Sequence, residues 1–292
     1  MRVKVLTQNL YLPIAGASHH SQRLADMAAE ASRFDILILQ EVFTFSVFGL
    51  STQSAKDWLK ERLKKEGFLY SFSSPNVLFA QCSGLLILSK FPLEEEKNKF
   101  ISYRTFAGIE IFTSKGALKC YVKVDPNLPP LVIIDTHLQC YSGGENAVEV
   151  RKTQLKYLAN KLLEGETNCI VAGDMNICAR NDVERYKEML EILNPVRDIL
   201  AEKAYAQGHD SQAREVTMSN AERPDESLDY IFLRAAKEGP RWEYEDGSCQ
   251  VEKIKASSKT WGVLAKGNKT DEDPGTISDH YGVSAVFYYH DS

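Results

Sequence analysis

Polar residues of the types found in metal sites and phosphoryl-transfer sites recur at the ends of apolar segments of this sequence. They are Asn9 after VKVLTQ, Glu41 after ILILQ, His137 after VIIDT, Asp174 and Asn176 after CIVAG, Asp229 at the start of LDYIFL, and Asp279 with His280 before YGVSAVFYY. A strand end holds a side chain on rigid backbone at the rim of a sheet. The positions therefore indicate one preorganised site built from distant segments.

The residue types predict the chemistry of that site. Carboxylate and amide oxygens are ligands that Mg²⁺ prefers, together with water and substrate phosphate. Bound Mg²⁺ polarises a phosphoryl oxygen and stabilises a leaving alkoxide. A histidine beside a carboxylate serves as a general base near neutral pH. The combination favours Mg²⁺-dependent hydrolysis of a phosphoester, with Mn²⁺ or Co²⁺ as substitutes.

Each of these residues alone also has an ordinary structural interpretation. Asn9 alone is typical of a turn or a cap, and Asp174-Met-Asn176 is compatible with an Asx turn. His137 alone is compatible with a hydrogen-bonded structural histidine. The full set is more informative than its members because all of them lie at strand ends and suit a single mechanism.

The elements that position these residues follow from apolar periodicity. We expect strands at 3–8, 35–40, 85–89, 131–136, 169–172, 228–233 and 281–289, a pair of strands within 101–124 around the turn at 114–116, and helices at 21–33, 54–66, 145–163 and 183–193. Alternating strands and helices predict a layered α/β domain. Several neighbouring strands lack a helix-length spacer, so the sheets should be mixed or antiparallel.

Composition sets further limits. The chain has 292 residues, of which 43% are hydrophobic and 26% charged, and no repeat or long linker divides it. We therefore expect one catalytic domain over residues 1–292 and a monomer. No apolar run reaches the ~20 residues that span a bilayer. The start, MRVKVLTQNL, lacks a signal-peptide pattern, which leaves the cytoplasm, the membrane surface and secretion of a processed form as alternatives. The net charge of −5 disfavours nucleic acid as a partner.

Six ordered motifs resemble a known family. TQNL at 7–10, LQEV at 39–42, DTHL at 135–138, GDMN at 173–176, LDYI at 228–231 and SDHYGV at 278–283 are similar to motifs of the endonuclease/exonuclease/phosphatase superfamily, which has the DNase I-like fold. The resemblance implies a four-layer α/β sandwich, with two central mixed β-sheets flanked by helices. It also implies Mg²⁺-dependent cleavage of a phosphoester by an activated water.

The resemblance also implies metal ligands. Glu41 resembles the principal Mg²⁺ ligand of the family, and Asn9 supports it. Asp279 stands where a second carboxylate near the metal is expected.

Catalytic roles follow from the same motifs. Asp174 resembles the residue that orients the attacking water, and Asn176 resembles a phosphate ligand. His280 resembles the general base, and Asp229 the carboxylate that orients it. His137 resembles the histidine that stabilises the transition state or protonates the leaving group.

Within the superfamily, the sequence is most similar to neutral sphingomyelinases. The similarity lies in QEVF at 40–43, the SGL and SKFP segments within 83–93, the SKGAL turn at 114–118, and the helix after His137 that carries Arg151 and Gln154. It implies hydrolysis of sphingomyelin, or a related phospholipid, to ceramide and phosphocholine. Lys115 and Arg151 are the further candidates for substrate binding.

A lipid substrate calls for an apolar surface beside the metal site. Phe43, Phe45 and Phe48 follow Glu41 closely and are candidates for peripheral contact with a membrane surface. The alternative is that these rings are buried under a neighbouring loop.

Other functions of the same fold stay open at the level of sequence. A nuclease would need a continuous basic groove. An inositol polyphosphate phosphatase would need lysines and arginines clustered around the phosphate pocket. A non-enzymatic binding module is disfavoured because the metal-ligand and histidine set is intact.

Overall fold

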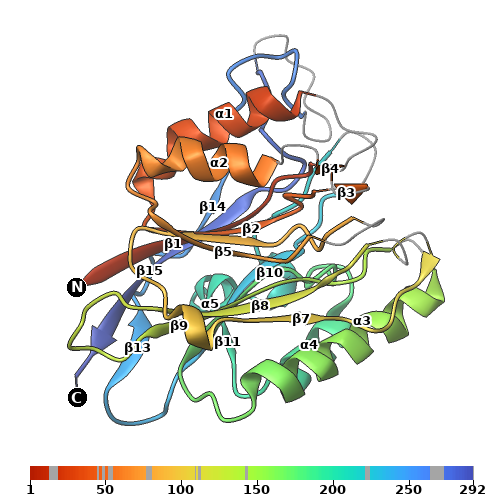
Figure 1. Cartoon of the computed structure of the whole chain (residues 1–292). Helices are drawn as coiled ribbons and strands as arrows, with labels where there is room; N and C mark the ends of the chain where they lie inside the picture. The colour runs from red at the N-terminus through yellow and green to blue at the C-terminus, as the bar shows by residue number, and fades with distance from the viewer. Residues whose placement is uncertain are drawn as a thin grey trace.

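This computed structural model describes residues 1–12, 19–44, 46–47, 50–51, 55–76, 81–108, 110, 113–141, 144–220, 224–263 and 273–291, with the backbone alone at 46–47 and 50–51. Two mixed β-sheets form the centre of the described structure, and helices cover their outer faces (Figure 1).

The first sheet has seven strands in the order β13-β15-β1-β2-β6-β5, with β14 also paired to β15. Their bounds are Arg2–Asn9 (β1), Ile36–Gln40 (β2), Tyr70–Ser73 (β5), Leu86–Ser89 (β6), Arg241–Tyr244 (β13), Gln250–Glu252 (β14) and Gly282–His290 (β15). β1 is parallel to β2 and antiparallel to β15.

The second sheet has six strands in the order β11-β12-β10-β9-β8-β7. Their bounds are Lys99–Ser102 (β7), Gly116–Val122 (β8), Leu131–His137 (β9), Cys169–Asp174 (β10), Arg197–Asp198 (β11) and Asp229–Arg234 (β12). β9 and β10 are parallel, and β12 is antiparallel to β10. A short hairpin, β3 (Ser46–Val47) with β4 (Leu50–Ser51), stands apart from both sheets.

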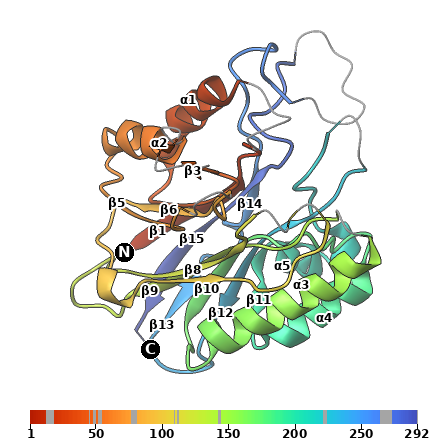
Figure 2. The ribbon, with the colours of Figure 1, turned by 45° about the vertical axis from the view of Figure 1, so that its right-hand side comes forward.

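Helices α1 (His20–Glu30) and α2 (Ala55–Lys64) cover the first sheet, and α3 (Glu145–Leu158) and α4 (Val183–Leu193) cover the second (Figures 1 and 2). Helix α5 (Ile199–Ala206) follows β11, and short helical turns of the described residues lie at Ala31–Arg33, Glu95–Lys97, Ala159–Leu163 and Ser211–Ala213. The layers are thus helix, sheet, sheet, helix.

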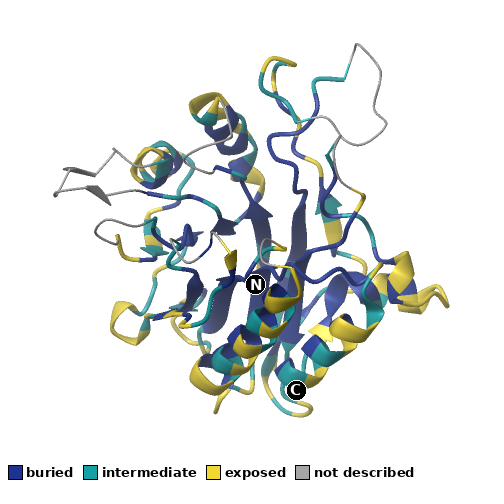
Figure 3. Ribbon diagram, turned by 90° about the vertical axis from the view of Figure 1, so that its right-hand side faces the viewer, coloured by how far each residue is buried: buried dark blue, intermediate teal, exposed yellow. Residues whose placement is uncertain are grey.

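Successive side chains of a strand point to opposite faces of its sheet, and this alternation explains how four layers form. Inward-facing residues such as Val5, Ile38, Ile133 and Ile231 build the core between the two sheets. Their neighbours in sequence face the helices on the outer sides. The central strands β2, β9, β10 and β12 are therefore buried on both faces, and Figure 3 shows the central strands buried while exposed residues lie on the outer helices and the loops.

The predicted fold class is confirmed, and the differences from the predicted elements are local. The first strand of the pair expected within 101–124 ends at Ser102, and the connection before β8 occupies the residues up to Lys115. The helix expected at 145–163 is α-helical to Leu158 and continues as one π-helical turn. Strands β5 and β13 and helix α5 were not predicted, because each is too short for a period of apolar residues to stand out in the sequence.

A close approach of β10 to β9 explains the glycine that precedes Asp174. Gly173 has a φ of +132°, and a Cβ atom there would lie 1.9 Å from the carbonyl oxygen of Thr136. No side chain fits at that distance, so the glycine lets the two strands pair with their polar ends side by side.

We expect Gly173→Ala to destabilise the fold strongly, because the methyl group must push β10 away from β9. Gly208→Ala is the matched control, since Gly208 also has a positive φ, +78°, but a Cβ atom added there would meet nothing within 4 Å. The control should cost about 1–2 kcal/mol from backbone strain alone. Thermal unfolding of both variants measures the difference, and equal losses would contradict the steric explanation.

Candidate active site

Strand direction brings the polar strand ends together at one rim. β1 and β2 end there, as do β9 and β10, whereas the antiparallel strands β12 and β15 begin there. In the second sheet Asp174 is in register with His137 on one side and with Asp229 on the other. Asn9, His137, Asp174 and Asp229 also continue the inward-facing alternation of their strands, so they point into the space between the sheets.

Asn9 joins carboxylates from the two sheets. Its amide nitrogen donates to Oε1 of Glu41 and to Oδ2 of Asp174, each at 3.0 Å, and its Oδ1 accepts from the backbone N–H of Tyr11. Burial raises the pKa of the Glu41 carboxyl, and the hydrogen bond from Asn9 acts in the opposite direction. Glu41 also has a φ of 59°, a left-handed backbone that a glutamate rarely adopts.

His280 lies between two aspartates. Its Nδ1 is 2.9 Å from Oδ2 of Asp229, and its Nε2 is 3.8 Å from Oδ2 of Asp174. Burial lowers the pKa of the imidazole, but the negative charges of Asp229 and Asp174 outweigh burial and leave that pKa well above its ordinary value. Burial also raises the pKa of Asp174, to about 7. Asp229 thus orients the imidazole of His280 through Nδ1, and the carboxylate of Asp174 lies 3.8 Å from Nε2 on the other side of the ring.

His137 completes the centre of the site. Its Nε2 lies 3.5 Å from Oδ2 of Asp174 and 4.0 Å from Oε1 of Glu41. The ammonium of Lys115 is 3.1 Å from the same nitrogen, and it also contacts the carbonyl oxygen of Leu138 at 2.6 Å and Glu110 at 2.6 Å. Burial and the charge of Lys115 hold the pKa of His137 well below its ordinary value.

Asn176 and Asp279 flank this centre. The amide nitrogen of Asn176 donates to the carbonyl oxygen of Leu138, and its backbone N–H donates to Oδ1 of Asp174. Oδ2 of Asp279 accepts from the amide of Asn220, whereas its Oδ1 is buried with no partner. Burial raises the pKa of Glu41, and the negative charge of Asp279 acts in the same direction.

The donors present suit a divalent cation. Asp174, Asp229 and His280 form a buried group whose potential ligand atoms all lie within 4.8 Å of one another. Glu41 and Asp279 add carboxylates beside this group, and an oxygen of Asp229 and one of Asp279 are buried without a partner. Buried oxygen atoms that lack a hydrogen bond, next to carboxylates whose ionisation burial opposes, fit a hard cation such as Mg²⁺.

A protein-family comparison identifies the chain. The profile of the endonuclease/exonuclease/phosphatase family matches residues 6–280.

The chain belongs to the endonuclease/exonuclease/phosphatase family.

Solved structures similar to this family member share its fold over nearly its full length. SmcL has 19% sequence identity and a TM-score of 0.73, with 98% of each chain covered. Sphingomyelinase C from Streptomyces griseocarneus has 19% identity and a TM-score of 0.67, covering 98% of this chain and 99% of that one. A beta toxin variant from Staphylococcus aureus with bound magnesium ions has 19% identity and a TM-score of 0.70, with the same coverage. No curated protein sequence matches the chain.

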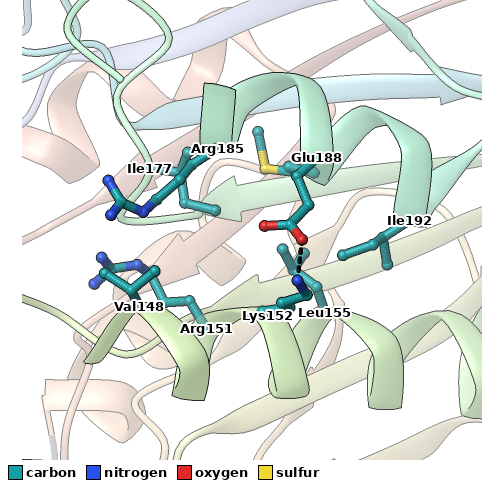
Figure 4. A pocket seen from close by; sticks show the side chains of 9 residues that line it. Val148, Arg151, Lys152, Leu155, Ile177, Arg185, Glu188 and Ile192 are labelled. Atoms are coloured by element: carbon teal, nitrogen blue, oxygen red, sulfur yellow. Dashed lines mark ion pairs between the residues drawn. The ribbon is translucent and has the colours of Figure 1, made fainter. Parts of the chain in front are cut away.

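Arg151, one of the predicted substrate-binding residues, lies to the side of this centre. Its guanidinium donates to the carbonyl oxygens of Gln139 and Cys140 and lies 4.9 Å from the centre of the Tyr141 ring. None of its described hydrogen bonds reaches the side chains of the centre. It lines a narrow groove between α3 and α4, where its guanidinium lies near that of Arg185 (Figure 4).

The predicted membrane contact falls largely outside the described residues. Phe45 and Phe48 are among the residues that the structure does not describe. Phe43 is half-buried and packs against Gly84, where an added Cβ would lie 2.7 Å from its ring. None of the helices in the described ranges is long and apolar enough to span a membrane.

Several polar residues that support the site were not predicted from the sequence. Gln40 and Asp135 meet between the sheets directly behind the rim. Arg23 on α1 donates to the carbonyl oxygens of Leu10, Tyr11 and Ile277, and thereby holds the segments that carry Asn9 and Asp279. The sequence does contain a pattern that could have identified Gln40 and Asp135, because each is a polar residue at an inward position of an apolar strand. No comparable pattern in the sequence identifies Arg23.

We expect Lys115→Met to destabilise the protein by about 3 kcal/mol, because it leaves Glu110 largely buried without its cation. Lys123→Met is the control, since Lys123 pairs with Glu94 on the surface and its side chain is 52% exposed. That variant should lose less than ~1 kcal/mol. Urea denaturation compares the two, and a loss for Lys115→Met no larger than that of the control would refute the assignment of a buried ion pair.

Proposed function

We propose that this chain is a Mg²⁺-dependent phosphodiesterase that hydrolyses sphingomyelin, or a related phospholipid, to ceramide and phosphocholine. The observation that carries the proposal is the Asp229–His280 pair facing Asp174 at the rim where Glu41 also lies. This arrangement can hold a water molecule and accept its proton beside clustered carboxylates that suit a metal ion.

Glu41, supported by Asn9 and Asp279, would hold the metal ion. When bound, Mg²⁺ supplies positive charge that stabilises a phosphoryl oxygen and offsets the negative charge around His280. The amide nitrogen of Asn9 keeps Glu41 and Asp174 together, since it donates to both carboxylates. Asn9 therefore acts through its hydrogen bonds, while the carboxylate oxygens supply ligands.

The attacking water would lie between Asp174 and His280. Asp174 orients the water, and Nε2 of His280 accepts its proton while Asp229 holds the ring through Nδ1. The water oxygen bonds to phosphorus, and the bond from phosphorus to the ceramide oxygen breaks. The leaving oxygen takes up a proton from water, His280 returns its proton to the solvent, and phosphocholine departs as the second product.

The remaining residues would bind the phosphate. Asn176 lies beside Asp174 with its side chain at the surface of the site, and His137 points its Nε2 at the same centre. Lys115 uses its ammonium on Glu110, Leu138 and His137, so it contributes positive charge and holds His137 in place. Because its ammonium contacts three protein atoms, its location supports a role through His137, and the direct substrate contact expected from the sequence stays a prediction.

The state of the cations supports a substrate with one phosphate group. Lys115 and Arg23 are buried and donate to protein oxygens. Arg151, on α3, donates to two carbonyl oxygens to the side of the centre, and its Nε is buried without a partner. A polyphosphate would require cations with free donors around the pocket. The similarity of QEVF and SKGAL to sphingomyelinase motifs supports the lipid.

A nuclease of the same fold is the second candidate, because the chemistry at phosphorus is the same. The net charge of −5 argues against it, since a polyanion is attracted by a basic surface. Parallel hydrolysis of sphingomyelin vesicles, lysophospholipids and DNA separates the two functions. Activity confined to DNA would replace the lipid assignment.

We expect phosphocholine release from sphingomyelin vesicles to stop in EDTA and to return with Mg²⁺. His280→Ala and Asp174→Asn should each lower kcat by at least ~100-fold with the fold intact, because one removes the general base and the other the group that orients water. Circular dichroism controls for folding. Near-normal turnover by either folded variant would overturn its assigned role.

The metal ion has two candidate sets of ligands. One is Glu41 with Asp279, and the other is the group of Asp174, Asp229 and His280. Two variants distinguish these sets. We expect Glu41→Gln to weaken Mg²⁺ binding at least ~10-fold, because it removes the carboxylate of the principal ligand. Asp229→Asn should bind Mg²⁺ nearly normally yet lose turnover, because Asp229 serves His280. Calorimetric titration of Mg²⁺ measures both. The reverse pattern would place the ion at Asp174, Asp229 and His280.

A further inference from the structure

A polar contact between Gln40 and Asp135 crosses the space between the two sheets, behind the one that Asn9 makes with Asp174. Gln40 ends β2 in the first sheet, Asp135 lies within β9 in the second, and both side chains are 0% exposed. The amide nitrogen of Gln40 is 2.8 Å from Oδ1 of Asp135. Apart from Thr7, the inward-facing residues that precede them on β1, β2 and β9 are apolar, so this pair lies at the end of the apolar core nearest the site.

The orientation of the Gln40 amide is fixed by its surroundings. The same nitrogen lies 3.2 Å from the carbonyl oxygen of Ile38, which can only accept a hydrogen bond. It is also 3.1 Å from Oγ1 of Thr7. The atom facing these oxygens is therefore the NH₂ group, and the amide oxygen faces the other way.

Two oxygen atoms of this pair are left without a partner. Oε1 of Gln40 and Oδ2 of Asp135 are both buried and neither has a hydrogen bond. No lysine, arginine or histidine among the described residues forms an ion pair with Asp135 to compensate a negative charge. A buried carboxylate with one hydrogen bond and no cation is strongly unfavourable. One proton on Oδ2 would remove the charge and supply a donor for Oε1.

We propose that Asp135 is held as a neutral carboxylic acid, paired with the side-chain amide of Gln40, and that this pair is a positioning element that sets the distance between the two sheets beneath the active site. Burial also favours the neutral form of Asp135, since it raises the pKa of this carboxyl well above its ordinary value. The neutral acid donates through Oδ2 and accepts through Oδ1, which matches the two halves of the amide.

Gln40 and Asp135 are close in sequence to two residues of the active site, so their separation affects the geometry of that site. Gln40 is bonded to Glu41, and Asp135 lies two residues before His137 on the same face of β9. Glu41 and His137 come from different sheets, and their side chains are 4.0 Å apart. A change in sheet separation at Gln40 and Asp135 would alter that distance first. The functional part of this inference rests on the proposed function, whereas the protonation state does not.

Infrared spectroscopy tests the protonation state without any substrate. A protonated carboxyl group has a carbonyl stretch that a carboxylate lacks. The difference spectrum between the wild-type protein and Asp135→Asn at neutral pH should contain such a band, because the variant removes only this acid. A difference spectrum with a carboxylate band in its place would overturn the inference, whether or not the protein hydrolyses lipids.

Rescue by the isosteric variant tests the positioning role. Asparagine has the shape of the neutral acid and offers Gln40 one acceptor and one donor, so Asp135→Asn should keep kcat within about twofold of the wild-type value. Asp135→Leu and Gln40→Leu should each lower kcat at least ~10-fold with a smaller change in KM, because catalytic groups from the two sheets are displaced.

Mg²⁺ affinity, measured by calorimetry, provides a readout that needs no substrate. It should be normal in Asp135→Asn and reduced in any leucine variant that folds. If Asp135→Asn lost activity and Mg²⁺ binding as severely as the leucine variants, a charged Asp135 would be required and the inference would fail. If the leucine variants do not fold, the infrared band and the asparagine variant still decide the matter.

Discussion

Desolvation of carboxylates at the rim between two packed sheets is the constraint on which the rest of this structure depends. Asp174 and Asp229 are buried and Glu41 is partly buried at the end of the core between the sheets, and burial opposes the charge of Glu41 and Asp174. The protein compensates with the amide of Asn9 and the imidazole of His280. These compensations leave some oxygens unpartnered, which suits a site that completes its interactions only when a cation and a phosphate bind.

The same constraint explains why charged residues near the site are each bonded to groups of opposite charge or to carbonyl oxygens. Lys115 lies beside Glu110 near His137, and Arg23 holds the carbonyl oxygens of the segments around Asn9 and Asp279. Each of these side chains is fixed by several hydrogen bonds within the core. Rigid support of this kind keeps the side chains of the site in place.

Much of the fold and the centre of the site could be predicted from the sequence, because both follow from strands. Apolar runs located β1, β2, β9, β10, β12 and β15, and the polar residues at their ends located Asn9, Glu41, His137, Asp174 and Asp229. Residues that act through long-range contacts were not found: Arg23 reaches carbonyl groups of two distant segments, and Glu110 lies in a connection without periodicity. The exposed rings expected near Glu41 depend on loop conformation, which periodicity does not determine.

The two sheets differ in how far apart their strands lie along the chain. The second sheet is built from one continuous stretch, from β7 to β12, whereas β15 returns from near the C-terminal end to pair with β1. The strand that carries Asp279 and His280 to the rim is thus the last strand of either sheet to be translated. A ribosome-bound chain can assemble the second sheet early, but it cannot hold a complete set of catalytic groups until β15 has been synthesised. Hydrolytic activity therefore appears only after this strand has left the ribosome.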